Sequence, residues 1–152
     1  MFPKDPRFAC VFEALRRRDF SEAAASATRL LAECSTADER AFLLNKRGVA
    51  NAALQRASDA RRDFDEALLQ IAEHPPALTN IGNLLFDAGE YEAAIAQYRR
   101  AISQDPLYAV AYVNLAAAYK RLGRFDEAVE ALRRAQRLEA SPGASWRPSP
   151  RT

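Results

Sequence analysis

Histidine and cysteine, the side chains that most often bind metals or act as nucleophiles, are scarce in this sequence. The 152 residues contain one histidine, His74, and two cysteines, Cys10 and Cys34. His74 precedes two prolines, with no second histidine and no nearby cysteine at a metal-ligand spacing, so we interpret it as a turn residue. No G-x-S-x-G, G-x-x-x-x-G-K-[ST] or G-x-G-x-x-G motif occurs. The sequence therefore predicts no catalytic residues, no metal, no cofactor and no enzyme activity.

The thiols and carboxylates have structural explanations as well. Two cysteines are too few for a disulfide framework, and we expect reduced thiols, with Cys10 on the inward side of the first helix. Aspartates and glutamates gather at expected helix starts and turns, where capping explains them without acid-base catalysis. We therefore expect the function of this chain to lie on a surface.

The elements that would build such a surface recur along the chain with a period of 34 residues. The stretch Pro75–Tyr108 is matched by Ala109–Pro142 after it and by Ala41–His74 before it. In the central copy the recurring residues are small, apolar or turn-forming: Leu78, Ile81, Gly82, Leu85, Ala94, Tyr98 and Pro106. This spacing resembles the tetratricopeptide repeat signature, W-x2-L-G-x2-Y followed by A-x3-F and P.

The resemblance implies an all-α fold, a right-handed α-solenoid of about four helix-turn-helix tetratricopeptide repeats. We expect one solenoid domain, made of a degenerate first repeat at 4–37, repeats at 41–74, 75–108 and 109–142, and a Pro/Ser/Arg tail at 143–152. Neighbouring repeats bury one another's apolar faces, so about three or four are needed for stability.

Helix boundaries follow from caps and glycines. The first helix is expected at about 5–18, and Thr36 with Glu39 forms a capping box that starts a helix at about 37–54. Gly48 and Gly82 occupy helix interiors, where glycine is tolerated if two helices approach closely. We expect Gly89 and Gly123 in turns, where a left-handed residue ends a helix.

Composition excludes several partners. The net charge is only +2, whereas nucleic-acid binding usually requires a concentrated basic surface, so we expect no nucleic acid partner. Arginine pairs near helix ends leave an RNA-reading helical repeat as a minor alternative, but the matched set of base-reading residues is lacking. The beginning MFPKDPRF lacks an apolar signal, and no stretch is long and apolar enough to span a membrane. We therefore expect a cytoplasmic protein with no membrane partner.

The family resemblance also implies a concave groove, lined by the first helix of each repeat, that binds peptides or helices of other proteins. The matching residues are Asn45, Lys46, Val49, Thr79, Asn80, Asn83, Phe86, Val113, Asn114, Ala117 and Lys120. Asn80 and Asn114 are one period apart, and we expect them to stand one above the other and hold a bound main chain. The alternative is that these asparagines form a polar groove wall and do not bind a main chain.

The family's best-known groove clamps acidic chaperone tails with lysines and an arginine, which this chain does not reproduce. The positions concerned hold Phe8, Pro76 and Asn80 in one register, and Asn45, Val110 and Asn114 in the other. We therefore predict an adaptor or scaffold that binds a peptide or helix of another protein, but not that ligand.

The alternative function is a self-associating structural protein or a secretion-type chaperone built on the same repeats. The end of the array bears on this choice, because the proline-rich tail cannot form the capping helix that usually covers the last repeat. We expect Trp146 to cover that apolar face, on its own chain or on a neighbour's. A homo-oligomer formed through the uncapped C-terminal repeat is therefore possible.

Overall fold

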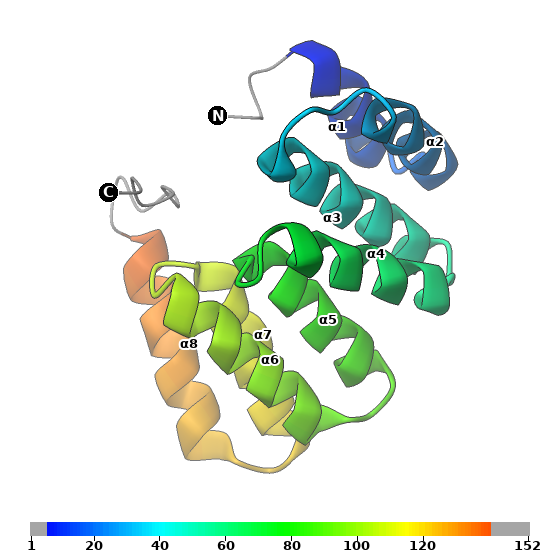
Figure 1. Cartoon of the computed structure of the whole chain (residues 1–152). Helices are drawn as coiled ribbons and strands as arrows, with labels where there is room; N and C mark the ends of the chain where they lie inside the picture. Colours follow the sequence, from blue (N-terminus) through cyan, green and yellow to red (C-terminus); the bar gives the residue numbers. More distant parts are fainter. Residues whose placement is uncertain (1–5, 141–152) are drawn as a thin grey trace. The chain divides into compact units, whose positions relative to one another are not determined.

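The computed structural model describes residues 6–140, and all regular structure in that range is helical (Figure 1). A short 3-10 turn, η2 (Pro6–Phe8), comes first. It is followed by α1 (Ala9–Arg16), α2 (Phe20–Leu31), α3 (Ala37–Ala53), α4 (Ala57–Gln70), α5 (Pro75–Asp87), α6 (Tyr91–Gln104), α7 (Ala109–Arg121) and α8 (Phe125–Glu139). The helices alternate with short turns, as expected of helical hairpins.

The N-terminal helix differs from the expectation at both ends. Where one helix was expected over 5–18, a 3-10 turn precedes α1, which ends at Arg16. Cys10 is exposed, so its expected inward position was wrong. The buried side of this segment carries Phe8, Val11 and Ala14, spaced three apart. One residue is about 100° of helix rotation, which places Cys10 off that side.

The chain divides into two compact units, residues 1–80 and 81–152, and the division falls within α5. In unit 1, α1 packs against α2, α2 against α3, and α3 against α4. In unit 2, α6 packs against α7, and α7 against α8. Each unit therefore contains helical hairpins and the contacts between successive hairpins.

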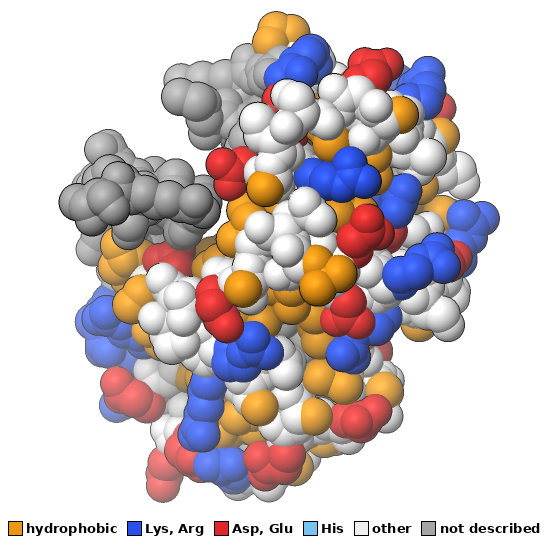
Figure 2. Space-filling view, viewed as in Figure 1, with side chains coloured by type: hydrophobic (Ala, Val, Ile, Leu, Met, Phe, Trp, Pro, Cys, Tyr) orange, Lys and Arg blue, Asp and Glu red, His pale blue; other side chains and the backbone are white. Residues whose placement is uncertain are grey.

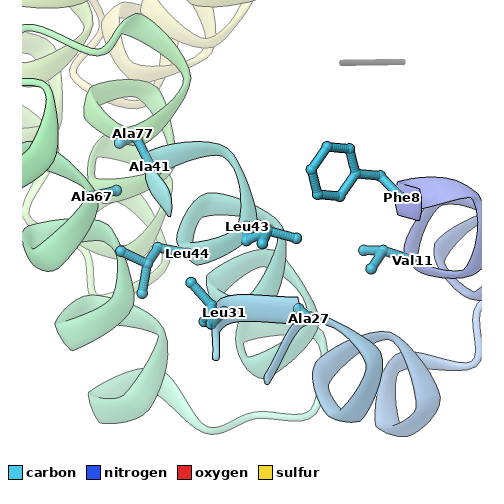
Figure 3. Close-up of a cluster of buried hydrophobic side chains, with 9 residues drawn as sticks. All are labelled: Phe8, Val11, Ala27, Leu31, Ala41, Leu43, Leu44, Ala67 and Ala77. Atoms are coloured by element: carbon cyan, nitrogen blue, oxygen red, sulfur yellow. The ribbon is translucent and has the colours of Figure 1, made fainter. Parts of the chain in front are cut away.

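Unit 1 contains two apolar clusters, of which the larger is drawn in Figure 3 and the smaller joins Ala14, Ala23 and Ala50. The larger cluster spans the whole unit. Its buried members come from η2 and from α1 to α5: Phe8, Val11, Ala27, Leu31, Ala41, Leu43, Leu44, Ala67 and Ala77. The cluster combines small alanines with larger leucines and a phenylalanine, and close-packed interiors are filled by side chains of such mixed size. The corresponding cluster of unit 2 is centred on Ile95, Tyr98, Leu115 and Tyr119.

A glycine lies against an aromatic ring in one hairpin of each unit. A Cβ atom added to Gly48 would lie 2.4 Å from Cε1 of Phe64, and one added to Gly82 would lie 2.4 Å from Cε1 of Tyr98. Even alanine is too large at that separation. The expected close approach at these two glycines is therefore present, and a ring from the second helix of the hairpin fills the space.

A left-handed residue ends the first helix of all four described hairpins. Gly89 and Gly123 have φ values of +82° and +73°, as expected from the sequence. In unit 1 the same conformation is adopted by Arg18 and Gln55, both with φ of 61°. The turn geometry is therefore retained in unit 1 without glycine, at a cost of about 1–2 kcal/mol for each left-handed residue.

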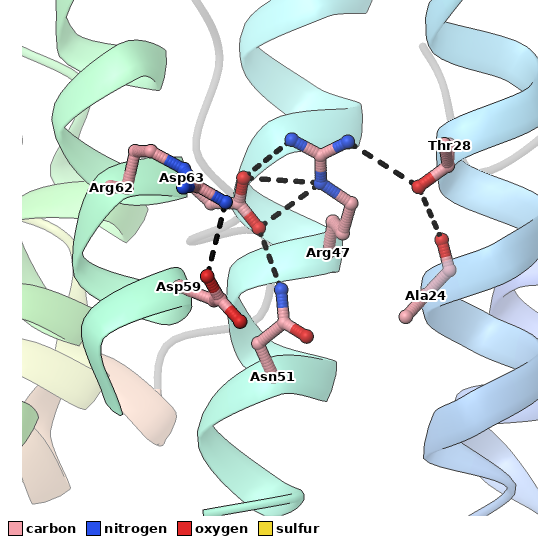
Figure 4. Close-up of polar contacts among 7 residues, drawn as sticks. All are labelled: Ala24, Thr28, Arg47, Asn51, Asp59, Arg62 and Asp63. Atoms are coloured by element: carbon pink, nitrogen blue, oxygen red, sulfur yellow. Dashed lines mark hydrogen bonds and ion pairs between the residues drawn. The ribbon is translucent and has the colours of Figure 1, made fainter. Parts of the chain in front are cut away.

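Unit 1 also contains a buried ion pair between α3 and α4 (Figure 4). Arg47 donates through Nε and Nη2 to the carboxylate of Asp63, with the shortest N–O distance at 2.6 Å. Asn51 donates to the same carboxylate at 2.9 Å, and Arg47 reaches Thr28 of α2 at 3.3 Å. One carboxylate therefore links two helices, and its arginine extends the link to a third.

Candidate functional site

An open hollow of about 310 Å³ lies in unit 2, where α5, α6 and α7 meet. It is lined by Asn83, Phe86, Asp87, Tyr98, Asn114 and Ala117. Four of these residues, namely Asn83, Phe86, Asn114 and Ala117, belong to the groove set expected from the sequence. The hollow is the place in unit 2 where those residues come together.

The polar floor of the hollow is organised around Asn83. Its Oδ1 accepts a hydrogen bond from Nδ2 of Asn114 at 2.9 Å and another from the Tyr98 hydroxyl at 2.9 Å. Tyr98 is fixed in turn because its ring packs on Gly82. Both amides are therefore held in place, which lowers the entropy that a ligand would have to remove on binding.

The apolar wall of the hollow is Phe86, which is part of an aromatic and cationic stack. Its ring lies edge-on to Tyr91, with centroids 5.2 Å apart. The Arg121 guanidinium lies 5.9 Å from the Phe86 centroid and 5.3 Å from that of Tyr91. Arg121 also donates from Nε and Nη2 to the Tyr91 hydroxyl at 3.0 and 2.9 Å. These contacts keep the Phe86 ring in a fixed orientation at the edge of the hollow.

Asp87 is the one charged residue in the lining, and it is exposed. Burial raises the pKa of the Tyr98 phenol well above its ordinary value, and the Asp87 carboxylate raises it further. Tyr98 therefore stays protonated and keeps donating to Asn83. The charge that a ligand meets in the lining of this hollow is negative.

The expected groove residues of unit 1 are mostly occupied with contacts inside that unit. Asn45 and Thr79 are buried, whereas Val49 and Asn80 are half-buried. Oδ1 of Asn45 accepts from Nδ2 of Asn80 at 2.9 Å. Lys46 places its ammonium 5.4 Å from the ring centroids of both Phe12 and Phe42.

Two titratable groups of unit 1 have lowered pKa values because they are taken out of water. Burial lowers the pKa of Lys46 below its ordinary value. Burial also lowers the pKa of His74 to about 4, and nearby Lys46 lowers it further, while Asp38 acts in the opposite direction. Nδ1 of His74 accepts from the backbone N–H of Ala77 at 3.2 Å. The expected turn residue is thus a neutral cap for the first turn of α5.

The remaining expected residues of unit 2 lie on α7. Val113 and Lys120 are exposed on α7, outside the lining. Asn80 and Asn114 belong to different units and bond to Asn45 and Asn83 respectively, each within its own unit. The two amides that were expected to act as one ladder are therefore each tied to a local partner.

Two lining residues were not anticipated. Tyr98 belongs to the apolar stripe of α6 and was interpreted as core, yet its hydroxyl reaches the hollow while its ring is buried. Asp87 is the last residue of α5 and was not singled out from the sequence. The role of Tyr98 could have been found by noting that it lies one period after Phe64, because only the hydroxyl differs and it needs a partner. No such signal marks Asp87.

The remaining expectations concern Trp146, membrane-spanning segments and metal sites. Trp146, the expected tail docking residue, lies outside residues 6–140. Among the residues that the structure describes, no helix is long and apolar enough to cross a membrane. Within the same residues no group of three or more histidine, cysteine or acidic side chains could hold a metal ion. Lysines, arginines and acids are interspersed on the face shown in Figure 2.

Comparison with known proteins finds family models that match part of this chain. A family model described as TPR repeat matches residues 82–123, and a model described as tetratricopeptide repeat matches residues 109–141. The Hsp70-Hsp90 organising protein of Plasmodium falciparum is 45% identical over 58 residues, which cover 38% of this chain and 23% of that relative. The matched region is therefore less than a quarter of the relative's length.

Solved structures show the same architecture. The crystal structure of MamA matches with a TM-score of 0.70 at 22% identity, over 88% of this chain and 76% of MamA. The second TPR of Spaghetti (RPAP3), bound to the HSP90 peptide SRMEEVD, matches with a TM-score of 0.61 at 19% identity, over 65% of this chain and 92% of that domain. The fold is an all-α helical repeat solenoid. The two family models, which together cover residues 82–141, identify tetratricopeptide repeats in this part of the chain.

Proposed function

We propose that this chain is a protein-interaction module that binds an extended peptide segment of a partner protein in the hollow of unit 2. The observation that carries the proposal is the convergence of four expected groove residues on that hollow, from two helices one period apart. An adaptor or scaffold role follows if the rest of the chain binds or positions other components. The proposal assigns no catalytic step to any residue.

The two asparagines supply the main-chain recognition. Oδ1 of Asn83 is already occupied, but its Nδ2 and the Oδ1 of Asn114 make no hydrogen bond among residues 6–140. One is a donor and the other an acceptor, which is what an extended peptide requires for its C=O and N–H groups. Each such bond contributes about 0.5–1.5 kcal/mol. Binding through the main chain would be tolerant of sequence.

Sequence preference would come from Phe86 and Asp87. The ordered Phe86 ring offers a flat apolar surface for one side chain of the peptide, because Tyr91 and Arg121 prevent it from turning away. The Asp87 carboxylate repels an acidic peptide and attracts a basic one. We therefore expect neutral or basic segments with one apolar residue, unlike the acidic peptide bound by the RPAP3 domain.

The first experiment fills the hollow. Peptides would be selected from a random phage-displayed library on the purified chain, and the affinity of a selected peptide measured by fluorescence anisotropy. Ala117→Phe places a ring in the hollow from an exposed position and should weaken binding about tenfold or more, equal to about 1.4 kcal/mol. Ala96→Phe is the matched control, because Ala96 is an exposed alanine of α6 outside the lining. Equal losses in both variants would remove the hollow as the site.

The second experiment tests the charge preference with the peptide SRMEEVD itself as the probe. The wild-type chain should not bind it measurably at concentrations that saturate with a selected peptide. Asp87→Lys should improve its binding and weaken that of basic selected peptides. Tight binding of SRMEEVD by the wild-type chain would show that the chain behaves as an acidic-tail receptor, and the preference proposed here would then be wrong.

A further inference from the structure

The outward side of α8 carries a stripe of large apolar side chains. Phe125 is 62% exposed, Val129 45% and Leu132 44%. Their spacings of four and three residues place them on one side of the helix. Scattered apolar residues on a surface are ordinary, but an aligned stripe on one helix indicates a surface that another segment covers.

In the preceding repeat, the equivalent side of α6 is covered by another helix. One period before Val129 and Leu132 stand Ile95 and Tyr98 of α6, which are only 2% and 1% exposed. α6 packs against α7, the first helix of the next hairpin. The same side of α8 has no such helix after it among the described residues, which end at Ala140. The stripe, defined here as Phe125, Val129 and Leu132, is therefore a docking surface by equivalence.

We propose that the segment 141–152 of the same chain folds back along α8 and places the indole of Trp146 on Leu132. Trp146 is the one large apolar side chain in that segment. Pro148 and Pro150 disfavour a helix, so the segment would dock in an extended form.

Chain length decides which part of the stripe the indole can reach. Six residues from Ala140 to Trp146 span about 20 Å at most when extended. Leu132 lies about 12 Å back along the helix from Ala140, whereas Phe125 lies about 22 Å back, at 1.5 Å per residue. Leu132 is therefore within reach and Phe125 is not. Because the segment is tethered, its effective concentration at Leu132 is in the millimolar range, which favours it over a free competitor.

The experiment uses Trp146 as its own reporter, since it is the single tryptophan of the chain. The full chain should emit at a shorter wavelength than a synthetic peptide of residues 141–152, and acrylamide should quench it more slowly. Neither property should change on dilution. Leu132→Gln should bring both properties to those of the free peptide, with helicity by circular dichroism unchanged. Phe125→Gln is the matched control and should alter neither.

A second variant leaves every helix residue in place. Deleting residues 143–145 leaves two residues, Ser141 and Pro142, between Ala140 and the tryptophan. The three residue steps then reach about 10 Å, which is shorter than the distance to Leu132. This deletion should expose the indole as fully as Leu132→Gln does. Emission equal to that of the free peptide in the wild-type chain, or emission unaffected by both variants, would overturn the proposal. A short-wavelength emission that disappears on dilution, together with a doubled mass by light scattering, would assign the stripe to a second copy of the chain instead.

Discussion

The two units make an equivalent helix contact with different chemistry. In unit 1, Arg47 of α3 meets Asp63 of α4, with Asn51 completing the carboxylate's hydrogen bonds. The residues one period later in unit 2 are uncharged: Ile81, Leu85 and Gln97. Repeat geometry therefore determines where two helices touch but leaves the kind of contact open. A buried ion pair and an apolar contact can be nearly equivalent because desolvation offsets most of the attraction between the charges.

The largest effect should come from removing half of the ion pair. Asp63→Ala leaves the Arg47 guanidinium without its carboxylate in a site where Asp63 is almost fully buried. We expect the free energy of unfolding to fall by about 3–5 kcal/mol, measured by urea denaturation. Gln97→Ala, at the equivalent position of unit 2, should cost less than about 1 kcal/mol because no charge is stranded there.

Replacing the whole network sharpens the same comparison. The triple variant Arg47→Ile, Asn51→Leu and Asp63→Gln copies the residues of unit 2 into unit 1. It should be as stable as the parent chain or more stable, because no unpaired charge remains. A triple variant as unstable as Asp63→Ala would mean that the two units do not make interchangeable contacts.

The two glycines that face aromatic rings should be nearly as sensitive. Gly48→Ala and Gly82→Ala each place a Cβ atom 2.4 Å from a ring carbon, so the ring must move. We expect a loss of about 2–3 kcal/mol in thermal or urea unfolding. The loss should be larger for Gly82, because Tyr98 is also tied to Asn83 whereas Phe64 has no hydroxyl. Adding Phe64→Leu to Gly48→Ala should recover part of the loss, since the smaller side chain leaves room for the methyl group.

Unit 1 should lose stability as pH falls from about 6.5 to 4, because His74 lies in it. The folded pKa of His74, about 4, lies below the ordinary value of 6.5, so the unfolded chain takes up a proton first as pH falls. The stability that His74 contributes is complete above about pH 6.5 and is lost between there and pH 4. We expect about 2 kcal/mol over that range, allowing for the part of the ring that remains exposed. His74→Asn keeps a capping acceptor without a titrating group and should flatten this dependence in urea unfolding measured at several pH values.

The smallest effect should come from the hairpin turns. Gln55 and Gly89 are one period apart and both have a positive φ. Gln55→Gly should stabilise the chain by about 0.5–1 kcal/mol, because relief of left-handed strain exceeds the added freedom of the unfolded chain. Gly89→Gln should destabilise it by a similar amount in the same thermal assay. Opposite signs at the two positions are the essential result, and equal signs would contradict the equivalence of the turns.

Much of the fold could be predicted because it depends on local signals. The period, the capping box of Thr36 and Glu39, and the two turn glycines all act within a few residues, and the structure has each of them. The turns at Arg18 and Gln55 contain no glycine at the left-handed position, so no such signal marked them in the sequence. Cys10 was placed wrongly because it precedes buried Val11 by one residue, about 100° of helix rotation away from the buried side.

The candidate site was harder to predict because it depends on which side chains bond to one another. Family register named Asn83, Phe86, Asn114 and Ala117 but gave no reason to distinguish them from Asn45 and Thr79, which are buried. The distinction comes from burial, which periodicity does not encode, because Asn45 and Thr79 are only 5% and 2% exposed. The charged position of Arg47, at a place that is apolar in the next repeat, was the one visible sign of the ion pair in unit 1.

The left-handed turns have a consequence for hydrogen exchange. In every described hairpin the amide just after the left-handed residue donates back to a carbonyl five residues earlier, at 2.9 Å: Asp19 to Ala14, Arg56 to Asn51, Glu90 to Leu85 and Arg124 to Tyr119. These turns lie at the surface, yet their amides should exchange with deuterium slowly. Because each bond breaks only when its own hairpin opens, the four exchange rates would give the opening free energy of each hairpin separately.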